Sequence, residues 1–397
     1  MIKFFLNNKN LLLVGFLTAF GSGFGQTYFI SLFGGYFRNL LDLTNGEFGS
    51  LYSAATMLSA ISLIWAGKLI DNVALKKYIM IIIFGFSLTC LLTSRVSNVY
   101  ILFICLFFLR FFGQGLMGHT SRTTMARYFN QNRGKALAIS SYGLAFGEMV
   151  YPLLAVLFIG LMGWRYTWLS CSIMLLVFFG SCFWVLLKNH NKRHEEFIKS
   201  QKNDKNISWR RRDVLSDIKF YCYLPSSLLT GFALTGFFFH QVHIATLKSW
   251  NLSLIAFGLF FYAVFSIIGS TISGFLIDKF KARTLMPYFL LPLIIIFTLL
   301  IFNEGPIILF IYMSWLGFTQ ALAETISGAL WAELYGVNNL GSIKALMTFF
   351  GVLASAASPF LFGFILDQGN TLNLLIVGTI ITIIVCSLLS YLGKYFK

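Results

Sequence analysis

The sequence contains little charge for its length. Only 11% of its 397 residues are Asp, Glu, Lys or Arg, and 57% are hydrophobic. A soluble domain of this size would need far more charged side chains on its surface, typically about a quarter of its residues. The composition therefore excludes an ordinary soluble globular protein and indicates a chain that lies in a membrane.

Several signatures of chemistry are also missing. The six cysteines show no metal-ligand spacing, so we interpret them as small apolar packing residues. The Gly-x-x-x-x-Gly-Lys-Ser/Thr pattern of a phosphate-binding loop is absent, which argues against ATP hydrolysis by this chain. No nucleophile with a base within reach can be identified. We therefore expect no enzyme, no catalytic residue, no metal and no cofactor. The cysteines are Cys90, Cys105, Cys171, Cys182, Cys222 and Cys386.

The sequence contains many long apolar runs. A run of about 20 apolar residues matches a hydrocarbon core about 30 Å thick. We predict an all-α membrane protein with twelve transmembrane helices, the first of them an uncleaved helix rather than a signal peptide. The predicted spans are 10–31, 47–66, 78–95, 99–121, 136–159, 166–187, 223–246, 252–273, 285–302, 306–331, 343–366 and 371–392.

The net charge of +16 reports the orientation of the chain. With both termini in the cytoplasm, most of the 30 Lys and Arg residues lie on the cytoplasmic side, as the positive-inside rule requires. We therefore predict a multi-pass protein of the cell (inner) membrane that contacts the lipid bilayer and binds no nucleic acid. The exceptions are Arg38, Arg95, Arg165 and Lys248 outside, and Arg110 within the membrane.

The chain divides into two similar halves. The long polar stretch 188–219 separates six spans from six others, which predicts an N-terminal bundle over 1–187, a basic cytoplasmic linker and a C-terminal bundle over 220–397. The pattern Gly-x-Leu-Ile-Asp at Gly67–Asp71 recurs 207 residues later at Gly274–Asp278. Internal repeats of this kind are typical of secondary transporters, whose sites lie at the interface of the repeats.

These motifs resemble the major facilitator superfamily. Gly67-Lys-Leu-Ile-Asp71 with Lys76 is similar to the family's loop signature, and Gly274-Phe-Leu-Ile-Asp278 with Arg283 is similar to its second copy. The resemblance implies two six-helix bundles with pseudo-twofold symmetry. It also implies alternating access, with these residues as a conformational gate. The first copy departs from the pattern, because Asn72 replaces a usual basic residue and Ala74 a usual glycine.

Two further stretches extend the resemblance. The run Arg110-Phe-Phe-Gly113-Gln114-Gly115 is similar to a family element in the fourth helix. The run Arg133-Gly134-Lys135-Ala136, with Gly143 onward to Pro152, resembles the monocarboxylate and oxalate/formate branch. This finer resemblance implies a small organic anion as the substrate.

Arg110 is the most informative single residue, because its guanidinium stays charged inside an apolar run. Gln114 follows one helical turn later and is expected on the same face. Glu148 in the fifth span lies at a similar depth. Arg110 and Glu148 form either a structural ion pair or a site in which Arg110 clamps a carboxylate substrate, and both interpretations remain open.

Other polar residues fall in the seventh and tenth spans. His240 and His243, three residues apart, are expected on one helix face, where they could bind an anion or carry a proton. Gln320 and Glu324 are also expected to share a face, with Glu324 as a proton carrier if burial raises its pKa. The alternative for each pair is an ordinary polar contact between helices.

The first span contributes Gln26 and Tyr28 beside a glycine-rich stretch. By resemblance, the first, fourth, seventh and tenth helices line the passage. We assign substrate binding to Arg110, Gln114, Gln26, Tyr28, His240, His243 and Gln320. The candidates for proton coupling are Glu148, Glu324 and His240.

We therefore expect a monomeric secondary transporter for a small organic anion, with proton-coupled symport or anion exchange. One alternative is efflux of hydrophobic or cationic compounds. An alternative of another class is a membrane sensor that binds a ligand on a transporter fold without moving it.

Overall fold

The computed structural model describes residues 2–67, 69–129, 133–188, 211–335, 340–369 and 372–396. These residues form helices joined by short turns, without a β-strand among them. The chain forms two compact units. Unit 1 comprises 1–43 and 54–204, and unit 2 comprises 44–53 and 205–397. Most of the expected linker, 189–210, lies outside the described residues.

The helices of unit 1 are α1 (Ile2–Gly21), η1 (Ser22–Gly25), α2 (Thr27–Ile30), η2 (Ser31–Phe33), α3 (Gly34–Leu41), α4 (Asn45–Ala66), α5 (Leu69–Asn72), α6 (Leu75–Thr93), α7 (Val99–Leu109), η3 (Arg110–Met117), α8 (Gly118–Tyr128), α9 (Arg133–Met174), η4 (Leu175–Phe179) and α10 (Gly180–Leu186), with the first residues of α4 grouped in unit 2. Those of unit 2 are α12 (Arg211–Leu215), α13 (Ile218–Phe239), α14 (Gln241–Leu247), α15 (Leu252–Phe280), α16 (Ala282–Leu285), α17 (Pro292–Phe302), α18 (Pro306–Tyr335), α19 (Leu340–Asp367) and α20 (Leu372–Leu392).

The predicted all-α membrane architecture is confirmed. Eight described helical runs are long and apolar enough to cross a membrane, and α17 is a shorter apolar helix. The longest run, 136–186, contains two predicted spans. They are separated at Gly163, whose φ of 82° a residue with a side chain rarely adopts.

Several predicted spans are more irregular than the apolar pattern indicated. The first span breaks at residues 22–26, the fourth becomes a π-helix at Arg110, and the seventh breaks at His240. Hydropathy measures how apolar a segment is, but it does not predict where the backbone departs from α-helical dihedral angles. These breaks matter because they occur where the sequence placed its candidate site residues.

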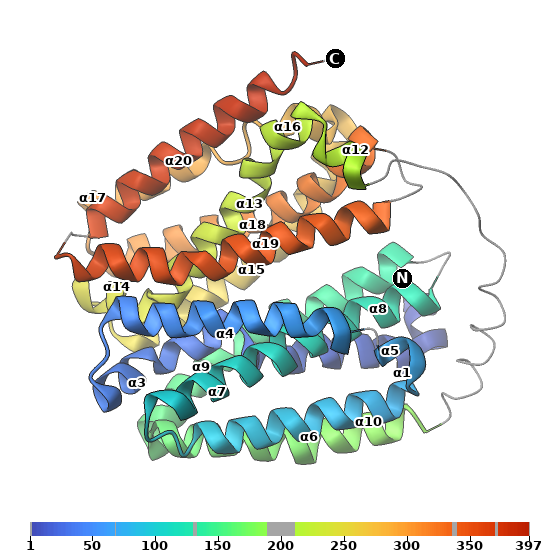
Figure 1. Cartoon of the computed structure of the whole chain (residues 1–397), viewed down its shortest axis with the longest axis vertical. Coiled ribbons are helices and arrows are strands. Elements are labelled where there is room, and N and C mark those ends of the chain that lie inside the picture. Colours follow the sequence, from blue (N-terminus) through green and yellow to red (C-terminus); the bar gives the residue numbers. More distant parts are fainter. Residues whose placement is uncertain are drawn as a thin grey trace. The chain divides into compact units, whose positions relative to one another are not determined.

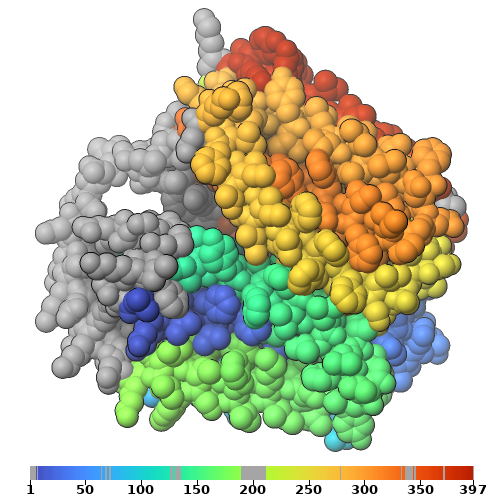
Figure 2. Space-filling model, turned by 180° about the vertical axis from the view of Figure 1, so that it is seen from behind, coloured from blue at the N-terminus to red at the C-terminus, as the bar shows by residue number. Residues whose placement is uncertain are grey.

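Glycines let the helices of each unit approach closely. In unit 1, a Cβ on Gly143 of α9 would overlap the carbonyl oxygen of Phe16 in α1. In unit 2, a Cβ on Gly317 of α18 would overlap the carbonyl oxygen of Tyr262 in α15. Small residues at helix crossings are how membrane helices gain packing contacts. On the face shown in Figure 2, the described atoms of each unit form a closely packed surface.

Serine hydroxyls also join helices inside each unit. In unit 1, the Ser87 hydroxyl donates to the Ser172 carbonyl oxygen at 2.9 Å. In unit 2, the Ser226 hydroxyl donates to the Cys386 carbonyl oxygen at 2.9 Å. Such bonds satisfy polar groups that have no water nearby.

Candidate functional site

The site with the most unusual geometry lies in unit 1, where two irregular helices cross. The first span leaves the helical path after η1, because Gln26 has extended backbone angles of φ −85° and ψ 154°. The fourth span, which begins as α7, continues as the π-helix η3. Discontinuous helices often form the binding sites of secondary transporters, and π-helical stretches are frequent at functional sites.

The crossing depends on two glycines. A Cβ on Gly25 would overlap the Leu109 carbonyl oxygen and lie 2.8 Å from the Cα of Gly113. A Cβ on Gly113 would lie 2.6 Å from the Cα of Gly25. These neighbours are backbone atoms, which cannot rotate away as a side chain can. The two backbones therefore touch only because both positions lack a side chain.

Arg110 holds this crossing together. Its side chain is buried, with 1% of its surface exposed. Its Nη1 donates a hydrogen bond of 3.0 Å to the carbonyl oxygen of Gly25. A break in a helix leaves backbone carbonyls without their regular partners, and the guanidinium satisfies one of them with a charge-assisted bond.

Tyr28 and Glu148 lie close to the same break. Tyr28 is buried, and Cβ atoms on Gly23 and Gly147 would lie 2.6 and 3.2 Å from its hydroxyl oxygen. Glu148 is half-buried and lies near Tyr28. The structure therefore places Glu148 near Tyr28. It also places Arg110 against Gly25, the residue before Gln26.

The two glutamines of this region are half-buried. Gln26 donates from Nε2 to the Ser22 hydroxyl at 3.3 Å, across the break. Gln114 lies within η3. Its expected alignment with Arg110 assumed α-helical spacing, and the wider π-helix changes that angular offset. Their assignment to substrate binding stays a prediction.

The two histidines lie in unit 2 at a second break. His240 separates α13 from α14, with φ −94° and ψ 10°, so the two histidines do not lie on one regular helix as the spacing predicted. His240 is buried, and its Nε2 lies 2.9 Å from the Pro359 carbonyl oxygen. A carbonyl can only accept, so this nitrogen carries a proton. His243 is half-buried in α14.

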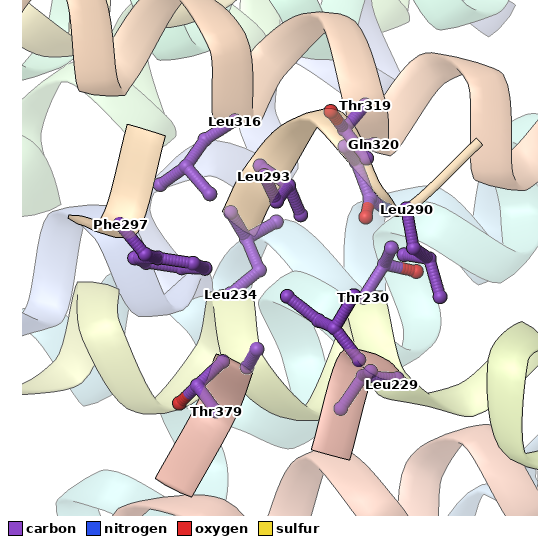
Figure 3. A pocket seen from close by; sticks show the side chains of 12 residues that line it. Leu229, Thr230, Leu234, Leu290, Leu293, Phe297, Leu316, Thr319, Gln320 and Thr379 are labelled. Carbon is purple, nitrogen blue, oxygen red and sulfur yellow. The ribbon is translucent and has the colours of Figure 1, made fainter. Parts of the chain in front are cut away.

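Gln320 and Glu324 contact each other in α18 as predicted. Nε2 of Gln320 donates to Oε1 of Glu324 at 3.0 Å. Gln320 points into a cavity of unit 2 near Thr230 and Leu290 (Figure 3). The cavity measures about 20 Å³, which suits about one water molecule and not an organic anion. Glu324 is exposed, so the buried position that we expected for this carboxylate is not found.

The gate residues differ between the two sequence copies. A Cβ on Gly67 would lie 3.4 Å from Nε2 of His119, whereas a Cβ on Gly274 would meet nothing within 4 Å. The side chains of Asp71 and Asp278 lie outside the described residues.

The described basic gate residues bind within their own units. Nζ of Lys76 lies 3.5 Å from the ring centroid of Trp184. Arg283 donates to the Tyr223 hydroxyl at 3.2 Å and to the carbonyls of Gly393 and Lys394 at 3.1 and 2.9 Å. The gate assignment stays a prediction.

Sequence reasoning missed Tyr151 as a neighbour of this site. It is buried beside Phe20 and Phe24, with ring centroids 4.6 and 4.3 Å away. Its hydroxyl has no hydrogen-bond partner among the described residues. A tyrosine before Pro152 in an apolar span resembles the many aromatic residues of this chain, so no sequence signal distinguished it.

Among the described residues, no group of three His, Cys, Asp or Glu side chains could hold a metal ion. The six cysteines are free thiols.

Comparisons with known proteins agree with this architecture. The family model of the Major Facilitator Superfamily matches residues 15–302. A bacterial homologue of the human lysosomal transporter Spinster, in an inward-facing and occupied conformation, has the same fold with a TM-score of 0.71. It is 13% identical, and the match covers 98% of this chain and 97% of that one.

The same type of bacterial protein in an inward-facing and unoccupied conformation gives a TM-score of 0.68 at 12% identity, with the same coverage. At these identities the likeness shows the fold. No curated protein sequence matches the chain. The family match covers most of the chain, and the helical architecture is that of a multi-pass membrane transporter. The chain therefore belongs to the major facilitator superfamily.

Proposed function

We propose that this transporter moves a small organic anion, such as a monocarboxylate, by alternating access coupled to protons. The observation that carries the proposal is a permanently charged guanidinium, buried where two irregular transmembrane helices cross. A buried charge in a membrane is costly and marks a substrate or ion pathway by default. A carboxylate is the ligand that best matches the planar fork of an arginine.

We propose that Arg110 exchanges partners when the substrate binds. A guanidinium has five N–H donors, and Nη1 of Arg110 binds a neutral carbonyl, that of Gly25. A carboxylate forms a stronger, charge-assisted pair with the same group. Binding of the anion would then weaken the bond to Gly25 and loosen the crossing of η1 with η3. Substrate binding would in this way change the contact between the first and fourth spans, which both depart from a regular α-helix.

Glu148 is our first candidate for the proton carrier. It is half-buried and lies near Tyr28, which follows the break at Gln26 by two residues. If this carboxylate takes up a proton when a substrate anion binds, the net charge of the site stays the same. His240 and Glu324 remain further candidates. His240 is enclosed and bound to a carbonyl, whereas Glu324 is exposed.

We propose that Gly67, Asp71, Lys76, Gly274, Asp278 and Arg283 form the conformational gate. Support comes from the repeat of the loop pattern and from the family match, whose matched residues 15–302 span both copies of the loop.

Transport by purified protein tests the proposal directly. The protein is reconstituted into liposomes, and uptake of labelled lactate, pyruvate and formate is measured against a labelled sugar and a labelled amine. We expect saturable uptake of at least one acid. Saturable flux of the amine with none of any acid would favour efflux of cationic compounds, and binding of an acid without flux would favour the sensor.

Arg110→Gln and Arg110→Lys test the clamp. Loss of a charge-assisted contact should weaken anion binding by about 1.5–3 kcal/mol, or roughly 10- to 150-fold. Lysine keeps the charge but lacks the fork, so Arg110→Lys should be intermediate. Arg165→Gln is the matched control, because Arg165 also donates from Nη1 to a carbonyl, that of Ser94, at 3.0 Å. Normal anion affinity in a folded Arg110→Gln variant would defeat the clamp.

Proton coupling has its own measurement. A liposome interior more alkaline than the medium should accelerate uptake of the acid in the wild type, and Glu148→Gln should remove that acceleration while leaving exchange of the acid. Uptake of the ionised acid that ignores the pH gradient would exclude proton coupling.

A further inference from the structure

A groove on the outer surface of unit 1 has features of a second binding site. It lies between α6 and the end of α10, which pack against each other along one edge of the unit (Figure 1). Its volume is about 650 Å³, within the range of small-molecule sites. The groove is lined by Ala74, Lys76, Lys77, Met80, Ile81, Phe84 and Trp184.

The head of the groove is positively charged. Lys76 and Lys77 lie in the first turn of α6, where the helix dipole is also positive, and that turn contains no acidic residue. Cations are unfavourable at a helix N-terminus, so an anion placed here gains from both lysines and from the helix. The ammonium of Lys76 is fixed over the ring of Trp184 at 3.5 Å, which orders one side of the head.

The rest of the groove is apolar and faces away from the interior of the unit. Ile81, Phe84 and Trp184 are 56%, 64% and 59% exposed. The wall runs about 10 Å along α6 from Lys77 to Phe84, at 1.5 Å per residue. Because α6 is one of the predicted spans, this wall passes from the membrane boundary into the hydrocarbon region.

We infer that this groove binds an anionic phospholipid, with its phosphate on Lys76 and Lys77 and one acyl chain along Met80, Phe84 and Trp184. The positive head selects a negative headgroup, and the apolar wall accommodates a chain that a water-soluble anion lacks. Basic pockets at the cytoplasmic ends of membrane helices bind lipid headgroups by this chemistry. The site is separate from the crossing of η1 with η3, and it requires no particular transport substrate.

Photolabelling of the intact protein tests the inference. Nanodiscs contain zwitterionic lipid with a small fraction of phosphatidylglycerol or phosphatidylcholine, each with the same diazirine-bearing acyl chain. Labelled peptides are mapped by mass spectrometry after irradiation. We expect phosphatidylglycerol to label the α6 and α10 peptides several-fold more than phosphatidylcholine does.

Substitutions then separate charge from apolar contact. Lys76→Gln and Lys77→Gln should each reduce labelling by phosphatidylglycerol on the order of fivefold, since one lysine near an anionic headgroup contributes about that factor. Trp184→Ala should reduce labelling of α10 by both lipids. Lys279→Gln is the matched control, because Lys279 also lies at a span end over an aromatic ring, 5.2 Å from Phe280.

Two outcomes would overturn the inference. One is equal labelling by the two lipids in the wild type. The other is labelling by phosphatidylglycerol that falls as much in Lys279→Gln as in Lys77→Gln. Either would reduce the groove to ordinary lipid-facing surface.

Discussion

Gly25→Ala is the sharpest test of how the crossing of η1 with η3 is built. The added methyl carbon would overlap the carbonyl oxygen of Leu109 and lie 2.8 Å from the Cα of Gly113. Both are backbone atoms, so the two helices must separate to accept it. Any separation also moves the carbonyl of Gly25 away from Nη1 of Arg110, which lies 3.0 Å from it.

The size of the effect follows from these two contributions. Overpacking of this kind costs about 1–3 kcal/mol, and loss of a hydrogen bond to a charged group costs about 1.5–3 kcal/mol. If the crossing relaxes but keeps the bond, only the first cost applies. If the bond breaks, the total is roughly 2.5–6 kcal/mol, which is a large part of a typical folding free energy of about 5–15 kcal/mol.

Thermal unfolding in detergent and acid uptake in liposomes measure the two consequences. Gly160→Ala is the control, because a Cβ on Gly160 of α9 would meet nothing within 4 Å. We expect Gly25→Ala to unfold at a clearly lower temperature than the control and to lose most uptake. A double-mutant cycle that combines Gly25→Ala with Arg110→Gln measures the interaction free energy between these two positions. If Gly25→Ala is as stable as Gly160→Ala, the close crossing is wrong.

Two further predictions concern other elements. Asp367 accepts hydrogen bonds from the backbone N–H groups of Asn45, at 3.0 Å, and of Gly46, at the start of α4. Asp367→Ala should therefore lower the free energy of unfolding by about 0.5–2 kcal/mol and speed hydrogen exchange of these two amides. Unchanged exchange would show that the carboxylate does not cap the helix. The buried Tyr151 hydroxyl has no partner among the described residues, so Tyr151→Phe should change the unfolding free energy by less than about 1 kcal/mol; a larger loss would reveal a hydrogen bond to an ordered water.

Some of the site was predictable from composition and pattern. Arg110 stands out because a cation within a long apolar run has no neutral form to adopt, and the structure shows it buried. The contact of Gln320 with Glu324 follows from spacing of four residues on a regular helix, and it is present. The expected shared face of His240 and His243 stays a prediction, because His240 lies between α13 and α14 and the spacing rule applies within one regular helix.

Other features depend on residues far apart in the sequence. One partner of Arg110 is the backbone carbonyl oxygen of Gly25, and no side-chain pattern in the sequence indicates this contact. The π-helix at Arg110 and the break at Gln26 are likewise invisible to hydropathy, because both segments stay apolar enough for a membrane.

The sequence alone determined that the chain is an all-α membrane protein, because apolar length and basic loops report solvation and topology directly, and the resemblance of its loop motifs pointed to the major facilitator superfamily. The tertiary structure alone decided where helices break, which glycines touch and what the buried arginine binds. Those outcomes depend on the close packing of neighbouring backbones, and the energy of such a contact is a property of both partners together.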